Sequence, residues 1–185
     1  MADPTHEASL SDGVIELRLI DKRDLEMIKR AAHNPDIRRR FALLKARPDE
    51  YFERYRELWR NGDGAAFTIS AVGGDPLGLT TVERREAGRV ELGLWLLPEA
   101  RGGGHATRGL RLASRWAVGQ PGVERLEVAT APEDKVAQGL AERAGFRREG
   151  ILRSYHVVDG RREDAMFFSL LPDELDEPPG ASSSP

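Results

Sequence analysis

The sequence contains no cysteine, and this absence excludes several kinds of chemistry at once. Without thiols the chain can form no disulfide, no thiolate metal site and no cysteine nucleophile. Histidine is scarce as well. The four histidines, His6, His33, His105 and His156, lie far apart, without the short spacing typical of metal ligands. We therefore expect no metal site.

An excess of basic charge is also missing. The formal net charge is −3, with 28 Lys and Arg against 31 Asp and Glu, so nucleic-acid binding as a main role is disfavoured. No apolar run approaches the roughly 18 residues of a membrane span, and the N-terminus has no signal-like segment. A hydrophobic content of 39% over 185 residues is ordinary for one globular domain. We expect a cytoplasmic protein without membrane or nucleic-acid partners.

Periodicity and turn residues predict a single α/β (α+β) domain over residues 14–172. Strands are expected at 14–20, 65–72, 76–83, 89–97, 125–130, 146–158 and 163–171. Helices are expected at 21–33, 49–60, 105–118 and 134–144. The short turns between the second, third and fourth strands predict an antiparallel meander, and the helix between the fourth and fifth predicts that these two run parallel. Both ends, residues 1–13 and 173–185, are expected to be flexible tails.

One turn has the composition of an anion site. It follows the fourth strand and contains three successive glycines, Gly102, Gly103 and Gly104, which let the backbone close on a phosphate without interference from Cβ atoms. The N–H groups in the first turn of the next helix lack intrahelical partners, and the helix dipole adds roughly half a positive charge there. Arg101 adds a planar cation suited to phosphate oxygens. We infer a site for a phosphate or diphosphate.

The order of the elements, together with four short motifs, resembles the GNAT acetyltransferase family. Residues 101–106 (RGGGHA) fit the family's pyrophosphate signature, Arg/Gln-x-x-Gly-x-Gly/Ala, and residues 144–150 (AGFRREG) match the end of its following helix. Residues 91–96 (ELGLWL) and 159–164 (DGRRED) look like the RimJ/RimL-like branch, which acetylates ribosomal-protein N-termini. The resemblance implies a mixed, mostly antiparallel sheet of about six or seven strands, with a splayed parallel central pair and helices on both faces.

The resemblance also implies an activity. It is the direct transfer of an acetyl group from acetyl-CoA to a primary amine, without an acyl-enzyme and without a metal. The acceptor would be a protein N-terminus, a lysine or a small-molecule amine, and the protein a monomer or homodimer. The pantetheine arm of the coenzyme lies between the splayed strands in this family. The residues implied to contact the coenzyme are Leu94, Trp95 and Leu96 through their backbones, Arg101, Gly102, Gly103, Gly104, His105, Ala106, Thr107 and Asp134.

An amine must lose a proton before it can attack, because an alkylammonium group has no free electron pair. We choose Glu91 as the base, acting directly or through water, against the alternative that it is an exposed strand residue or half of a cross-strand ion pair. Asp134 has the alternative role of a helix N-cap. The family's proton-donating Tyr and its Ser fall on Ala141 and Ala137, so the acid is unassigned.

Tyr155 and His156 are fallback proton donors, with plain strand positions as their alternative. The two substitutions by alanine motivate a second hypothesis, a non-catalytic acyl-CoA sensor, and a longer donor such as succinyl-CoA also stays open. A dinucleotide-binding oxidoreductase is disfavoured, because the glycines near residue 102 show no Gly-x-Gly-x-x-Gly register.

Overall fold

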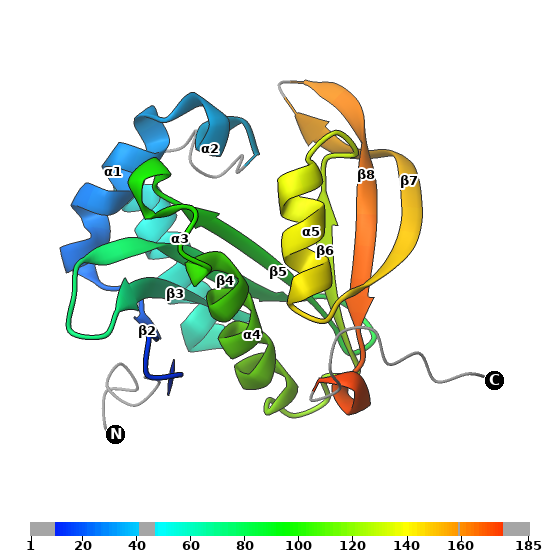
Figure 1. Ribbon diagram of the computed structural model, residues 1–185, viewed down its shortest axis with the longest axis horizontal. Coiled ribbons are helices and arrows are strands. Elements are labelled where there is room, and N and C mark those ends of the chain that lie inside the picture. The colour runs from blue at the N-terminus through cyan, green and yellow to red at the C-terminus, as the bar shows by residue number, and fades with distance from the viewer. Residues whose placement is uncertain (1–9, 41–46, 159, 176–185) are drawn as a thin grey trace.

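The computed structural model describes residues 10–40, 47–158 and 160–175, which form one mixed sheet covered by helices on both faces (Figure 1). The strands are β1 (Leu10–Ser11), β2 (Ile15–Leu19), β3 (Gly64–Ala71), β4 (Pro76–Arg84), β5 (Arg89–Leu96), β6 (Arg125–Thr130), β7 (Arg147–Val158) and β8 (Arg161–Leu170). The α-helices are α1 (Leu25–His33), α2 (Pro35–Arg40), α3 (Pro48–Asn61), α4 (His105–Val118) and α5 (Lys135–Arg143). Short 3-10 turns are η2 (Lys22–Asp24), η4 (Pro98–Ala100) and η5 (Pro172–Glu174).

The strand order is β1-β2-β3-β4-β5-β6-β8-β7. Every neighbouring pair is antiparallel except β5 and β6, which are parallel, so the predicted meander and the predicted parallel pair are confirmed. The described sheet has one strand more than the six or seven expected. The additional strand is β1, where Leu10 pairs with Leu17 inside the stretch expected to be a loose tail. Residues 1–9, Asp159 and residues 176–185 lie outside the described residues, and η5 contains the first residues of the expected C-terminal tail.

Two apolar clusters hold the helices against the sheet. On one face, side chains of α4 and α5, such as Leu110 and Ala141, pack on Leu92 and Leu126 of the central strands. On the other face, the buried residues are Ile28, Ala31, Tyr51, Phe52, Tyr55, Ala66, Leu79 and Trp95, which come from α1, α3 and the sheet. The predicted arrangement with helices on both faces is therefore confirmed. None of the described helices has both the length and the apolarity to cross a bilayer.

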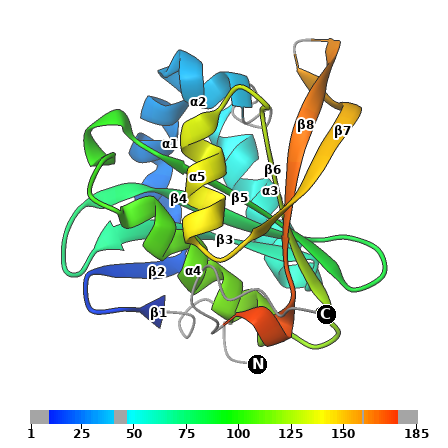
Figure 2. The ribbon, with the colours of Figure 1, turned by 45° about the vertical axis from the view of Figure 1, so that its right-hand side comes forward.

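The parallel strands β5 and β6 stay together over only three residue pairs. Their register runs from Arg89 with Arg125 to Glu91 with Glu127, and then the pairing stops. Beyond it β5 pairs only with β4, and β6 only with β8. The two strands diverge toward their C-terminal ends, as Figures 1 and 2 show. We call the point where they part, just after the Glu91–Glu127 pair, the fork.

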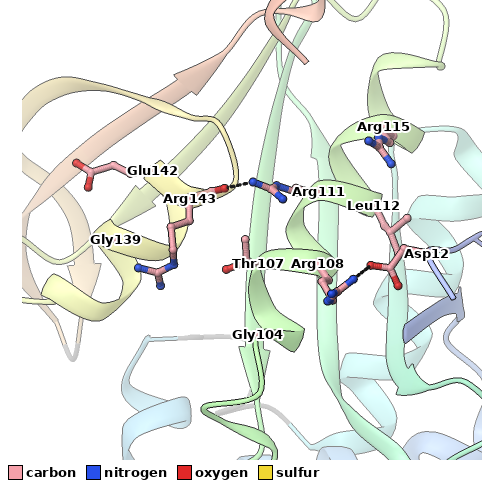
Figure 3. A pocket seen from close by; sticks show the side chains of 10 residues that line it. All are labelled: Asp12, Gly104, Thr107, Arg108, Arg111, Leu112, Arg115, Gly139, Glu142 and Arg143. Carbon is pink, nitrogen blue, oxygen red and sulfur yellow. Dashed lines mark hydrogen bonds and ion pairs between the residues drawn. The ribbon is translucent and has the colours of Figure 1, made fainter. Parts of the chain in front are cut away.

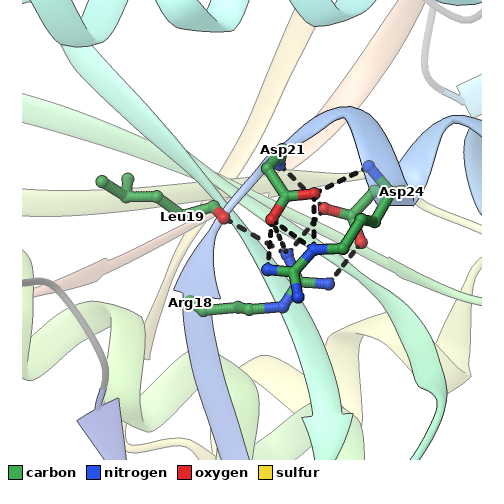
Figure 4. A network of polar contacts seen from close by, with 5 residues as sticks. Arg18, Leu19, Asp21 and Asp24 are labelled. Carbon is green, nitrogen blue, oxygen red and sulfur yellow. Dashed lines mark hydrogen bonds and ion pairs between the residues drawn. The ribbon is translucent and has the colours of Figure 1, made fainter. Parts of the chain in front are cut away.

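A buried ion pair fixes the start of the first helix to the sheet (Figure 4). The Asp24 carboxylate is fully buried and accepts hydrogen bonds from Arg18 Nη1 and Nη2, at 2.8 and 2.7 Å. It also accepts the backbone N–H of Asp21, at 2.9 Å, while Asp21 accepts the N–H of Arg23 in return. This reciprocal capping satisfies donors that would otherwise have no partner at the helix end. It ties α1 to β2, and α1 in turn packs on α3.

We predict that Asp24→Ala lowers the free energy of unfolding by about 2–4 kcal/mol, because it removes charge-assisted hydrogen bonds and leaves Arg18 without its buried partner. Urea denaturation followed by circular dichroism measures this loss. The matched control is Arg23→Ala, which removes a guanidinium that is 77% exposed and should change stability little. Equal effects of the two substitutions would contradict this role for Asp24.

Candidate functional site

The glycine turn joins the end of β5 to the start of α4. Gly102 and Gly104 have φ angles of 87° and 76°, in the left-handed region that glycine adopts readily. Gly104 is the N-cap of α4, and no side chain of the described residues caps this helix end. The first hydrogen bond of the helix joins Arg108 N to Gly104 O, at 3.2 Å. The N–H groups before Arg108 therefore point out of the helix, which is the geometry of an anion site.

Two side chains close around this turn. Arg101 reaches back to the end of β5, where its Nε and Nη2 lie 3.4 and 3.3 Å from the carbonyl oxygen of Leu96. His105 turns toward the same loop, with Nδ1 3.2 Å from Ala100 O. A Cβ at Gly103 would lie 2.7 Å from the His105 ring, so a larger residue there would require this ring to move. Arg101 stands at the mouth of the turn as predicted; its contact with a phosphate stays a prediction.

The stretch Leu94–Leu96 can offer a ligand its backbone more readily than its side chains. Trp95 and Leu96 are 4% and 6% exposed, and Leu94 packs partly buried against the core. On the side facing β6, this part of β5 has no strand partner in the chain as described. A strand edge of this kind can bind an extended chain through backbone hydrogen bonds. The expected use of these three backbones therefore fits the geometry.

A groove of about 730 Å³ lies beside the glycine turn, between α4 and α5 (Figure 3). Its lining includes Gly104, the N-cap of α4, and Thr107 in the first turn, both of which the sequence singled out. Its other lining residues are Asp12, Arg108, Arg111, Leu112, Arg115, Gly139, Glu142 and Arg143. The sequence analysis missed the arginines. Their signal was present, since residues 108, 111 and 115 recur at the spacing of one helix face.

Four arginines against two carboxylates give the groove a positive balance. Arg108 forms an ion pair with Asp12, at 2.7 Å, and the Arg111 guanidinium donates to the backbone carbonyl of Arg143 (Figure 3). No carboxylate of the described chain forms an ion pair with Arg111 or Arg143. Together with the open end of α4, these cations suit a ligand with several phosphates.

At the start of α5 the structure shows one of the two roles considered for Asp134, that of the helix N-cap. Its Oδ1 accepts the backbone N–H of Ala137, at 3.1 Å, so the helix-cap alternative is confirmed and a contact with the coenzyme stays a prediction. One turn further, Ala141 is fully buried in the core. Ala106 on α4 is half-buried against the same core. Ala137 and Ala141, the two alanines of α5, have no group that can donate a proton.

Glu91 lies at the last paired position before the fork. Both hydrogen bonds of its ion pair, from Arg85 Nε and Nη2 at 2.9 and 2.8 Å, end on Oε2. The ion pair considered from the sequence is therefore present, although its partner Arg85 lies in the turn just after β4 and not on a strand. Arg85 also contacts Glu83, at 3.1 Å, on the neighbouring strand β4. The Glu91 side chain is 32% exposed, so water can reach it beside the point where the strands part.

The charges continue across the sheet in register. Glu83 pairs with Glu91, and Glu91 with Glu127, so these three side chains share one face. Glu127 is bonded by Arg125, at 2.9 Å, and contacts Arg89, at 3.6 Å. We call this row of acids with its arginines the charged stripe. Each of the three carboxylates has a guanidinium group within ion-pair distance, so the face around the fork is polar without being strongly negative.

Helix α3 covers one end of the charged stripe. Tyr55 donates its hydroxyl hydrogen to Glu83 Oε1, at 3.0 Å. Burial, the neighbouring Tyr51 and the Glu83 charge raise the pKa of Tyr55 well above its ordinary value. Tyr55 therefore stays a neutral hydrogen-bond donor. Its role is to hold Glu83 and to pack against Tyr51, with ring centroids 5.0 Å apart.

The comparisons with known proteins agree with this geometry. The sequence profile of the acetyltransferase (GNAT) domain family matches residues 15–147. The chain belongs to this family. It is 31% identical over 87 residues to the uncharacterized N-acetyltransferase p20 of Bacillus licheniformis, a match that covers 47% of this chain. The chain spans about half the length of the curated relatives it matches, 45% of one and 49% of the other.

Solved structures show the same fold. The spermidine N-acetyltransferase of Vibrio cholerae, crystallised with CoA and spermine, superposes with a TM-score of 0.76 at 21% identity, covering 89% of this chain and 99% of that one. The ribosomal-protein-S5-alanine acetyltransferase of Vibrio fischeri gives a TM-score of 0.75 at 18% identity, covering 91% and 99%. The GNAT fold expected from the sequence is thus confirmed.

Proposed function

We propose that this protein is an N-acetyltransferase that uses acetyl-CoA and acetylates a primary amine. The observation that carries the proposal is the fork: the parallel strands part after Glu91, and β5 then continues to Leu96 and leads into a glycine turn whose helix end has no cap among the described side chains. An extended, amide-bearing arm that ends in a diphosphate fits these two features in succession. The arginines of the adjoining groove suit the remaining phosphate and the nucleotide.

Each part of the site then has a task. Backbone N–H groups of Gly103 to Thr107 and the Arg101 guanidinium hold the diphosphate. The backbones of Leu94, Trp95 and Leu96 hold the arm, and a backbone N–H there polarises the reacting carbonyl. Acetyl-CoA supplies the acetyl group as a thioester, whose carbonyl carbon bonds to nitrogen while its bond to sulfur breaks. Glu91, directly or through water, takes the proton that the amine loses.

At the two α5 positions where the family has a Ser and a Tyr, this chain has Ala137 and Ala141, and neither can donate a proton to the departing sulfur. A thiolate is stable enough to leave without one and to take its proton from water, because thiols ionise near pH 8.5. The same two alanines favour a second candidate, an acyl-CoA sensor without turnover. Donors with longer acyl groups, such as succinyl-CoA, are a further variant of the first candidate.

The test is an assay for free thiol with acetyl-CoA as donor and a panel of amines as acceptors. The panel contains peptides with free N-termini, peptides with lysine side chains, and polyamines. We expect thiol release that depends on one class of amine, with a mass increase of one acetyl group on that amine. CoA binding by calorimetry without turnover on any amine would favour the sensor. Absence of binding at millimolar concentrations would contradict both.

We predict that Glu91→Gln lowers kcat by roughly 100-fold near pH 7, while the affinity for CoA changes little. Glutamine still accepts hydrogen bonds from Arg85, so the ion-pair partner stays in place and only the base is lost. The matched control is Glu86→Gln in the exposed turn between β4 and β5, which should retain the wild-type rate. A wild-type rate for Glu91→Gln would remove this residue from the mechanism.

Arg101→Ala should weaken CoA binding roughly 5- to 100-fold, or about 1–3 kcal/mol, because a guanidinium–phosphate contact is lost. Calorimetry at two salt concentrations separates the loss of this contact from a general distortion of the site. Salt screens a guanidinium–phosphate contact, so the affinity of the wild type for CoA should fall more with added salt than the affinity of the variant. The control is Arg56→Ala on the exposed face of α3. Equal affinities for Arg101→Ala and the wild type would contradict the placement.

A further inference from the structure

Strand β7 contains a strained residue beside Asp164 of β8, beyond the fork in the direction in which β5 and β6 separate. Ser154 has a φ of 54°, in the left-handed region, which is unfavourable for a residue with a side chain. The register between β7 and β8 breaks at the same place, between Leu152 and His156. A bulge of this kind redirects the side chains beside it. Strain that persists in a folded protein must be held by its surroundings.

Two side chains of β8 hold this bulge. The Asp164 carboxylate accepts the backbone N–H of Ser154, at 2.8 Å, and Arg162 Nη1 donates to the Ser154 carbonyl, at 2.9 Å. Both residues belong to the segment 159–164, which carried the family resemblance but has no task in the reaction described so far. Together they bond the N–H and the C=O of one strained residue. These two side-chain hydrogen bonds replace the backbone hydrogen bonds of the ladder, which are interrupted at the bulge.

The bulge places Tyr155 on the face of the charged stripe. Its ring stands edge-on to Phe167 of β8, with centroids 5.5 Å apart, and edge-on to His156, at 4.9 Å. Phe167 pairs with Ala129, which lies two residues beyond Glu127 on β6 and so points to the same face. Tyr155 therefore lies beside Phe167 of β8, on the face of the sheet that carries Glu127.

The charged groups around the fork shift the pKa of the Tyr155 hydroxyl. Burial and the carboxylates of Glu91 and Glu127 raise the pKa of Tyr155, while Arg85 and Arg89 lower it. The residue is 41% exposed, so a ligand can reach it. Because its pKa is raised from that of an ordinary tyrosine, the hydroxyl stays protonated near pH 7 and is a poor acid for a departing thiolate, since thiols are the stronger acids. A neutral hydroxyl beside two carboxylates is instead well suited to bind an amine.

We propose that Tyr155, held by the Asp164–Ser154–Arg162 bulge, positions the acceptor amine against Glu91. The proposal rests on the transferase function proposed above. The hydroxyl oxygen accepts one N–H of the incoming ammonium, and the negative charges of Glu91 and Glu127 stabilise the cation before its proton is removed. Tyr155 takes no part in bond making, so it is a positioning residue, and Asp164 acts only through it.

The experiment uses the full chain and steady-state kinetics with the best amine of the panel. We expect Tyr155→Phe to raise KM for the amine about tenfold, with kcat within about threefold and KM for acetyl-CoA within about twofold. Asp164→Ala should raise the amine KM in the same way. The double variant should have the same amine KM as Tyr155→Phe alone. Asp164 acts only by placing the Tyr155 hydroxyl, so moving a ring that lacks this hydroxyl has no additional effect.

Arg161→Ala, next to the bulge on β8, is the matched control and should behave as the wild type. If Asp164→Ala does not fold, Arg162→Ala removes the other contact and replaces it in the cycle. An unchanged amine KM for Tyr155→Phe, or effects that multiply in the double variant, would overturn this inference while leaving the transferase function intact. A wild-type protein that binds CoA but turns over no amine would overturn both.

Discussion

The structure depends on the loss of hydrogen bonding between two parallel strands. β5 and β6 are paired as far as Glu91 and Glu127 and then separate, which leaves the edge of a central strand without a partner. A sheet can tolerate this only if other contacts hold the two halves apart. Here α4 packs against β5, and α5 against β6 and β7, on the same face of the sheet. The opening is thus a product of packing, and it points to a ligand that completes the sheet.

The two sides of the site use different physics. The coenzyme side proposed above is made of backbone groups: the first turn of α4, two glycines with positive φ and the edge of β5. The proposed acceptor side is made of charged side chains, arranged in register across β4, β5 and β6. The glycine turn leaves a motif in the sequence because glycine readily adopts its positive φ angles, whereas a row of ion pairs depends on strand register. This difference explains why the sequence identified the coenzyme side with motifs and could not name the acceptor.

The hairpin of β7 and β8 adds a third component. Its strained residue, Ser154, is held by two side chains that would otherwise look like ordinary surface charges. The segment 159–164 was visible in the sequence as a family feature, but its physical use was not. A motif made of exposed charges carries no local structural preference that reveals its partners. Only the register of the hairpin shows that Asp164 and Arg162 meet the same residue.

The sequence by itself determined β2 to β8, four of the five described α-helices (all but α2), their order and the glycine turn, because periodicity, turn residues and the φ preference of glycine act over a few neighbouring residues. It also indicated the parallel pair and the family. The tertiary structure alone decided that Arg85 binds Glu91, that Arg111 and Arg143 share a groove, that Asp134 caps a helix and that β1 joins the sheet. Most of these contacts depend on strand register and helix packing, which bring residues from separate elements together. Local sequence carries no record of such distances.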